Sequence, residues 1–317
     1  MVQPLTFLGD IMLESFIVPL LAATVQSGTP ILYATLGEIL TEKGGVLNLG
    51  VEGMMSMAAF VAFVVSLTTG NAWLGFFCGG LAGTFMAMLH GLVCITCLGN
   101  QVVSGLALTI LGVGLCNFLG TPYIGMGIEG FDKFDFPLLS SIPYLGDIFF
   151  KQDALVYVSF IIPFLFMIFM NRTSLGLAIT AVGEKPAAAA AVGLKAVRLR
   201  WIALLGGGFL IGLGGAYLSL AYTHLWANGL SGGRGWIAVA LVIFAFWRPG
   251  RAVFGAYLFG GVMAFQLRLQ AIGTHIPSSL LLMLPYALTI LVLIFSAVRG
   301  RSGNAPAHLG INIEPEG

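Results

Sequence analysis

The sequence predicts an all-α polytopic membrane protein with about nine transmembrane helices, within a range of eight to ten. Hydrophobic residues make up 58% of the 317 residues and charged residues only 9%, whereas soluble domains average about 45–50% apolar residues. The mean hydropathy is +0.98. The apolar residues also gather in runs long enough to cross a bilayer, which takes roughly 17–25 residues of helix. Composition and patterning therefore indicate the same fold class.

The apolar runs, taken in order, locate the expected spans. The run at 234–247 is short for a full crossing, so we expect a tilted or partly re-entrant element there. We interpret 1–317 as a single transmembrane domain with loops at about 121–153 and 172–200. The expected spans lie near 15–38, 51–68, 73–96, 101–120, 154–170, 201–222, 234–247, 252–267 and 280–298.

Charge in the loops predicts the orientation, because short cytoplasmic loops carry an excess of Lys and Arg. Segment 172–200 has five basic residues against one acid, so we expect it in the cytoplasm. Segment 121–153 has five acids against two lysines and should be external. Counting spans from this pair places the N-terminus outside and the C-terminus in the cytoplasm. The same count places the TEKGG turn at 41–45 in the cytoplasm. It also places the remaining basic residues there: Arg248, Arg251, Arg299 and Arg301.

Glycine recurs at four-residue spacing in two apolar runs. Gly75, Gly79 and Gly83 form one series, and Gly208 and Gly212 form another. Small residues at this spacing lie on one helix face and let two backbones approach closely. The series predict packing seams within the bundle; the alternative is a dimer interface inside the membrane.

The sequence offers no site for covalent chemistry. It contains no G-x-x-x-x-G-K-[ST] phosphate loop, no H-E-x-x-H, no Cys/His cluster at metal spacing and no G-x-S-x-G elbow. We therefore expect no enzyme activity, no metal and no bound cofactor. The formal net charge of +1 argues against a nucleic-acid partner, which needs clustered basic residues.

Polar residues that interrupt the apolar runs are the candidates for a path through the bundle, because unpaired polar groups are costly in lipid. They fall in three clusters, at 37–55, 99–109 and 228–244. The structural alternatives are solvated loop charges in the first, a helix start in the second and an outer turn in the third. The candidate path residues are Glu38, Asn48, Glu52, Gln101, Ser104, Thr109, Arg234 and Trp236.

The stretch VGEKPAAAAAVGLK at 182–195 predicts a short helix in the basic loop. Pro186 suits a first helical turn, five alanines follow, and Gly193 suits the end. Such a short helix is marginal on its own in water. We therefore expect it to dock into a groove of a partner protein; the alternative is a plain connecting helix.

Four blocks resemble the permease subunits of ABC importers in the branched-chain amino acid, ribose and nucleoside family. They are GEILTEKGGVLNLGVEGMM, NQVVSGLALTILGVGL, RTSLGLAITAVGEKPAAAAAVGL and SGGRGWIAVALVIFAFWRPG, and they run in order over about 30–300. The GVLNLGVEG segment at 45–53 is most similar to the shorter of two permeases in nucleoside and simple-sugar importers.

The resemblance implies a permease that couples to a separate ABC ATPase, which would hydrolyse the ATP. Other implied partners are a second, different and longer permease, an external substrate-binding protein, a small-molecule substrate and the lipid bilayer. The implied location is a bacterial-type inner membrane. The family pattern Gly-Glu-x-Pro-x-Ala is matched, with Lys where Asn is common. The implied coupling residues are Gly183, Glu184, Lys185, Pro186, Ala187, Ala188 and Ala189.

The resemblance predicts nucleosides as the substrate, with ribose or another simple sugar as the alternative. Thr109 stands where this subgroup would carry Asn, a departure that bears on the substrate rather than on family membership. An ion-coupled secondary transporter is the alternative from a different class. It would need paired carboxylates deep in the spans, whereas Glu38 and Glu52 lie near the ends of apolar runs.

Overall fold

The computed structural model describes residues 16–274, 276–298 and 305–313. The two chain ends and the predicted cytoplasmic residues Arg299 and Arg301 lie outside the described residues.

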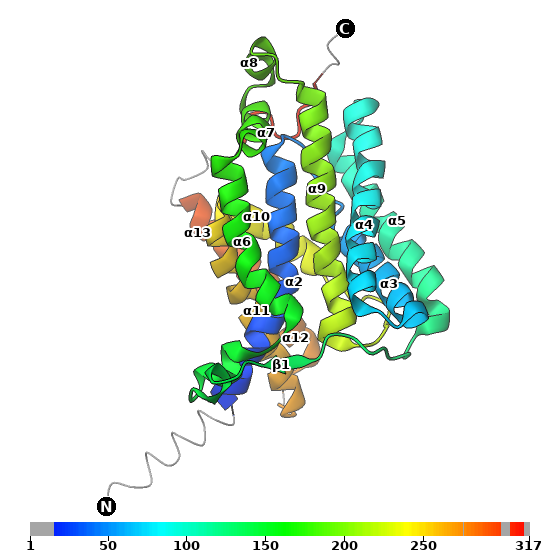
Figure 1. Cartoon of the computed structure of the whole chain (residues 1–317), viewed down its shortest axis with the longest axis vertical. Coiled ribbons are helices and arrows are strands. Elements are labelled where there is room, and N and C mark those ends of the chain that lie inside the picture. Colours follow the sequence, from blue (N-terminus) through cyan, green and yellow to red (C-terminus); the bar gives the residue numbers. More distant parts are fainter. Residues whose placement is uncertain (1–15, 275, 299–304, 314–317) are drawn as a thin grey trace, which may run out of the picture.

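The chain forms an upright bundle of helices (Figure 1). Its long helices are α2 (Val18–Lys43), α3 (Val51–Thr69), α4 (Ala72–Gly91), α5 (Gln101–Gly120), α6 (Ala154–Arg172), α9 (Ala196–Tyr217) and α11 (Pro249–Ala271). Shorter helices are α7 (Ser174–Glu184), α8 (Pro186–Ala191), α10 (Arg234–Ala245), α12 (Ser278–Leu282) and α13 (Leu284–Val298). Helices α4 and α9 continue into π-helical turns at Leu92–Thr96 and Leu218–Thr223.

Six of the described helices are long and apolar enough to cross a membrane: α3, α4, α5, α6, α9 and α11, with α4, α5 and α9 counted together with the helical turns that follow them. The other three predicted runs correspond to α2, α10 and the α12–α13 pair. Helix α10 has 12 residues and is therefore about 18 Å long, well short of the roughly 30 Å hydrocarbon layer. The short element predicted at 234–247 is thus present.

Helix α2 forms the centre of the bundle. Every residue from Ser27 to Glu42 is buried, as expected for a helix surrounded by others. It packs against α9 and α11 (Figure 1). Pro30 lies inside the helix, and nearby hydroxyls, such as that of Thr29, donate to the carbonyl four residues back (2.9 Å).

The two glycine series meet where α4 crosses α9. A Cβ added to Gly83 would lie 2.6 Å from the Gly212 Cα, and one added to Gly212 would lie 2.9 Å from the Gly80 Cα. These distances leave no room for a side chain. The predicted packing seam is confirmed, and it joins two helices of the same chain.

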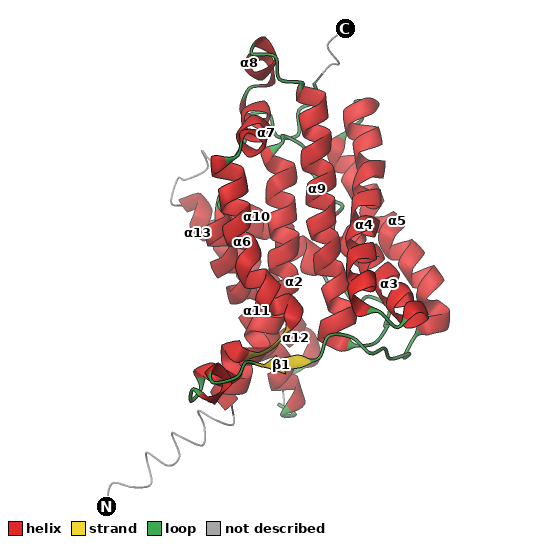
Figure 2. Cartoon of the chain, in the orientation of Figure 1, coloured by secondary structure: helices red, strands yellow, loops and turns green. Residues whose placement is uncertain are grey.

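The predicted loops lie at opposite ends of the bundle. Segment 121–153 contains a feature that an all-α prediction omits, a two-stranded antiparallel sheet of β1 (Lys133–Asp135) and β2 (Lys151–Asp153), seen in yellow far from α8 in Figure 2. Asp153 then caps α6, accepting the Leu155 and Val156 N–H groups at 3.0 Å. Burial raises the pKa of its carboxyl, against the lowering effect of these hydrogen bonds.

Candidate functional site

Glu52, in the first turn of α3, holds the start of α10. Its carboxylate accepts the Ser231 hydroxyl at 2.6 Å and the N–H groups of Gly233 and Gly235 at 2.9 and 2.7 Å. The N-cap residue, Gly233, has no side chain that could accept these bonds. A carboxylate at a helix N-terminus satisfies free N–H groups and the helix dipole together. Glu52 therefore fixes α10 and the loop before it to α3.

Arg234 begins α10 and folds back over the preceding loop. Its guanidinium lies 5.0 Å from the centre of the Tyr222 ring and donates to the Ser231 carbonyl oxygen at 3.2 Å. Gly232 and Gly233 have φ values of +56° and +81°, which glycine adopts without strain. Arg234 is only 6% exposed, while Trp236 is 37% exposed. The predicted Gly-rich, non-helical segment is present, and the Arg234 side chain packs against it.

Asn48 organises the non-helical segment 44–50 between α2 and α3. Its amide donates to the Glu38 carboxylate at 3.1 Å and accepts the Gly50 N–H at 2.9 Å. Glu38 and Asn48 are fully buried. The Glu38 carboxyl also interacts with the buried Glu42 carboxyl, one turn further along α2. Glu38 and Asn48 of the first predicted cluster are therefore joined directly, whereas Glu52 of the same cluster bonds to the start of α10.

The polar residues of α5 serve the same segment. Gln101 accepts the Leu47 N–H at 2.8 Å, and Thr109 donates to the Leu49 carbonyl at 2.9 Å. Ser104 is linked to segment 44–50 through His90. The His90 Nδ1 is 3.0 Å from the Ser104 hydroxyl, and its Nε2 is 3.1 Å from the Leu47 carbonyl oxygen. These side chains replace the helical hydrogen bonds that segment 44–50 lacks.

Several residues in these networks were not predicted. The Ser56 and Ser231 hydroxyls are 2.9 Å apart beside Glu52, and the Trp247 indole donates to the Glu42 carboxylate. Ser56 follows Glu52 by four residues, a spacing that could have shown it on the same helix face. The Trp247 contact joins positions that are 205 residues apart and carries no local signal.

The Ala-rich helix forms as predicted, as α8, and projects beyond the bundle (Figure 1). Gly193, just past its end, has a φ of +84°. Pro186 and Ala189 are buried, whereas Ala187 and Ala188 are exposed. One side of this short helix therefore packs on its own chain, and the other side is open.

Segment 305–313, here called the C-terminal strap, lies against the junction of α7 and α8. This contact was not predicted. The His308 N–H donates to the Gly183 carbonyl at 2.9 Å, and the Ala307 N–H donates to the Glu184 carboxylate at 3.3 Å. His308 Nδ1 is 3.1 Å from the Glu184 carbonyl oxygen. Glu184 is thus engaged within the chain.

The strap also reaches α9 and α5. The Arg200 guanidinium donates to the Ile311 carbonyl at 2.7 Å, and Gln101 donates to the Asn312 side chain at 2.8 Å. Gly183 in turn lies against the turn after α2, since an added Cβ would be 3.2 Å from the Gly45 nitrogen. The α7–α8 loop, the strap and segment 44–50 therefore form one connected end of the bundle.

Comparison with known proteins adds to this geometry. A family model described as branched-chain amino acid transport system / permease component matches residues 20–293. The "Putative glucose ABC transporter permease protein TsgC13" of Haloferax volcanii is 42% identical, covering 91% of this chain and 94% of its own. The nucleoside ABC transporter permease protein NupC of Lactococcus lactis is 33% identical (84% and 88%). The guanosine ABC transporter permease protein NupQ of Bacillus subtilis is 32% identical (88% and 91%). No solved structure matches the chain significantly.

Proposed function

Because the chain belongs to the permease family of branched-chain amino acid transport systems, we propose that it is the shorter permease of an importer for nucleosides or simple sugars, coupled through α8 to a separate ATPase. The family makes it an ABC transporter permease subunit and a multi-pass membrane protein. Such a subunit moves a solute and performs no covalent chemistry on it.

The observation that carries the coupling proposal is the two-sided burial of α8. Ala189 is 4% exposed and packs with the chain's own core, whereas Ala187 and Ala188 are exposed. A surface of small side chains lets another protein's backbone approach closely. Residues 183–189 thus pack against the chain's own core on one side and are exposed on the other, which suits a binding surface for an ATPase.

A continuous set of contacts leads from the junction of α7 and α8 to the proposed path. Gly183 touches the turn after α2, segment 44–50 follows, and Glu52 ties the start of α3 to α10. Displacement of α8 by an ATPase would therefore bear on the loop around Arg234. Ligands that bind two states differently shift their populations, and ATP in the partner would supply that difference for the inward-open and outward-open states.

Substrate choice stays within the sugar and nucleoside class. The resemblance in the sequence favours a nucleoside, and NupC and NupQ are named for such cargo. The higher identity to TsgC13 favours a simple sugar as the second candidate. Competition tests both candidates, with uptake of labelled adenosine and of labelled glucose measured separately. Unlabelled adenosine and unlabelled glucose should differ about tenfold or more in the concentration that blocks this uptake. Failure of both to compete would contradict the substrate class.

The coupling proposal is tested by Ala188→Trp, with Leu145→Trp as the control at the other end of the bundle. Both positions are exposed, so neither change should disturb the chain's own packing. Overpacking a close contact costs about 1–3 kcal/mol, which corresponds to roughly 5- to 150-fold in affinity. We expect Ala188→Trp to lose ATPase co-purification and uptake while Leu145→Trp retains both. Full uptake by the Ala188→Trp variant would make α8 a plain connector.

We also propose that the α8 end faces the cytoplasm, with the N-terminus outside, as the basic loops predict. Cysteines at Ser141 and Lys195 test this in a chain lacking the four native cysteines, since both positions are exposed. An impermeant thiol reagent should label Ser141→Cys from outside intact cells and leave Lys195→Cys unlabelled. The opposite pattern would invert the orientation.

A further inference from the structure

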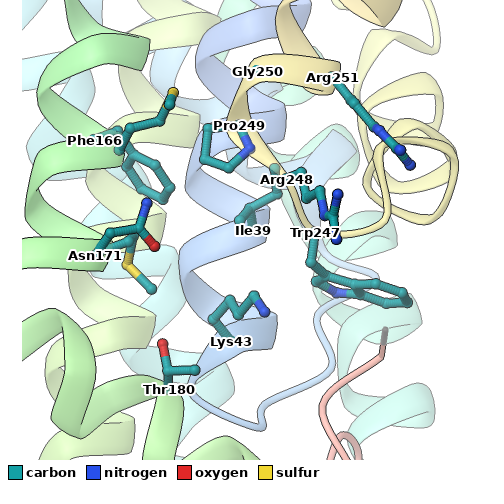
Figure 3. A pocket seen from close by; sticks show the side chains of 12 residues that line it. Ile39, Lys43, Phe166, Asn171, Thr180, Trp247, Arg248, Pro249, Gly250 and Arg251 are labelled. Atoms are coloured by element: carbon teal, nitrogen blue, oxygen red, sulfur yellow. The ribbon is translucent and has the colours of Figure 1, made fainter. Parts of the chain in front are cut away.

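A cavity of about 550 Å³ lies at the α8 end of the bundle, apart from the polar networks described above. Its walls come from α2, α6, α7 and the turn between α10 and α11 (Figure 3). Lys43, Asn171, Thr180, Arg248 and Arg251 supply its polar groups. No Asp or Glu among the described residues lines it, so the cavity is basic.

Two of these cations are unpaired within the described residues. Neither Lys43 nor Arg248 forms an ion pair or donates a side-chain hydrogen bond there. Glu184 acts on Lys43 only at longer range, and Arg248 repels it. Arg251 is turned away from Asn171 and stacks over Phe246, 5.1 Å from the ring centre (Figure 3). Lys43 and Arg248 are therefore the available pair.

The backbone fixes Arg248 at the rim of this cavity. Phe246 and Trp247 both have φ of +53°, a conformation that non-glycine residues seldom adopt. The hydrogen bond from the Trp247 indole to the buried Glu42 carboxylate holds this turn. An unusual turn held by a buried hydrogen bond keeps the two like charges, Lys43 and Arg248, near each other.

The wall opposite Arg248 is apolar and continues along α6. Phe166 and Met170 are buried, and Met167 lines the cavity while remaining 40% exposed. Phe164 and Phe160, three and seven residues before Met167, lie on the same helix face and are exposed as well. An apolar stripe therefore runs from the cavity along the outer surface of the bundle.

We propose that this cavity binds the phosphate of an anionic phospholipid, with Lys43 and Arg248 as its charge partners and an acyl chain along Met167, Phe164 and Phe160. Basic pockets between helices on the cytoplasmic side suit anionic head groups. A free phosphate would satisfy the cations equally but would leave the stripe on α6 unused. This lipid site goes beyond the transport function and names a ligand other than the substrate or the ATPase.

The test uses the full chain, purified in detergent with the partners that accompany it, stripped of lipid and then titrated. Native mass spectrometry compares phosphatidylglycerol with phosphatidylcholine, and inorganic phosphate is added as a competitor. Each basic group near an anionic head group contributes roughly a factor of five. We expect Lys43→Gln/Arg248→Gln to weaken phosphatidylglycerol binding about 25-fold and to leave phosphatidylcholine unchanged. Arg198→Gln, an exposed basic position at the same end, should have no effect.

A second variant guards against misfolding: Arg248→Lys keeps the charge and should retain most of the binding. Equal phosphatidylglycerol binding by the double variant and Arg198→Gln would overturn the site. Displacement of the lipid by millimolar inorganic phosphate would overturn the lipid assignment. Loss of ATPase co-purification in the double variant with unchanged lipid binding would assign the cavity to the partner protein instead.

Discussion

Two of the non-helical segments between the described helices are held in different ways. The end of segment 224–233, just before α10, depends mainly on one carboxylate, since Glu52 accepts hydrogen bonds from Ser231, Gly233 and Gly235. Segment 44–50 is held by several separate contacts, among them those of Asn48, Gln101 and Thr109. The first support is concentrated in one side chain, and the second is distributed over several helices. A distributed support lets an end of the bundle move without losing all its bonds at once.

The variant expected to have the largest effect on this difference in support is Glu52→Ala. It leaves the Ser231 hydroxyl and two N–H groups without their acceptor, so we expect a loss of about 3–5 kcal/mol in the free energy of unfolding. Glu52→Gln keeps one acceptor oxygen and should lose about half as much. Thermal unfolding in detergent measures both. A loss below about 0.5 kcal/mol for Glu52→Ala would show that the loop has other support.

A second change removes the C-terminal strap by ending the chain after residue 304. Arg200, which is 2% exposed, would lose its acceptors at Ile311 and His308, and the α7–α8 loop would lose its bonds to Ala307 and His308. We expect a stability loss of about 1–3 kcal/mol and weaker ATPase co-purification, with membrane insertion retained. His308→Ala keeps the backbone bonds and should cost less. Unchanged ATPase binding after the deletion would separate the strap from coupling.

The smallest effect is expected for Thr109→Val, which removes a single bond to the Leu49 carbonyl at nearly constant shape. We expect a loss of about 0.5–1.5 kcal/mol, because the other contacts of segment 44–50 remain. Uptake should persist if the hydroxyl is structural. A change in the ratio of nucleoside to sugar uptake, with unchanged stability, would instead place Thr109 in the path.

Local patterns predict much of this fold, and long-range pairing accounts for the rest. The long apolar helices, the glycine seam and α8 follow from spacing and composition within short windows. The sequence also points to Glu52 and the glycines before α10, but it does not show that they bond, since they are about 180 residues apart. The strap was missed because 305–313 has neither an apolar run nor a regular period. Several of its contacts are made by backbone groups, which every residue carries.

The strap is also synthesised well after the α7–α8 region that it contacts. Its contact with Glu184 joins residues that are 124 positions apart, and at about 5–20 residues per second the ribosome makes the strap roughly 6–25 s after the loop that it braces. Until then the ends of α2, α7 and α9 are in place without this brace. A nascent chain therefore has an unfinished surface at this end, and the proposed ATPase-docking surface is complete only when translation has passed the strap.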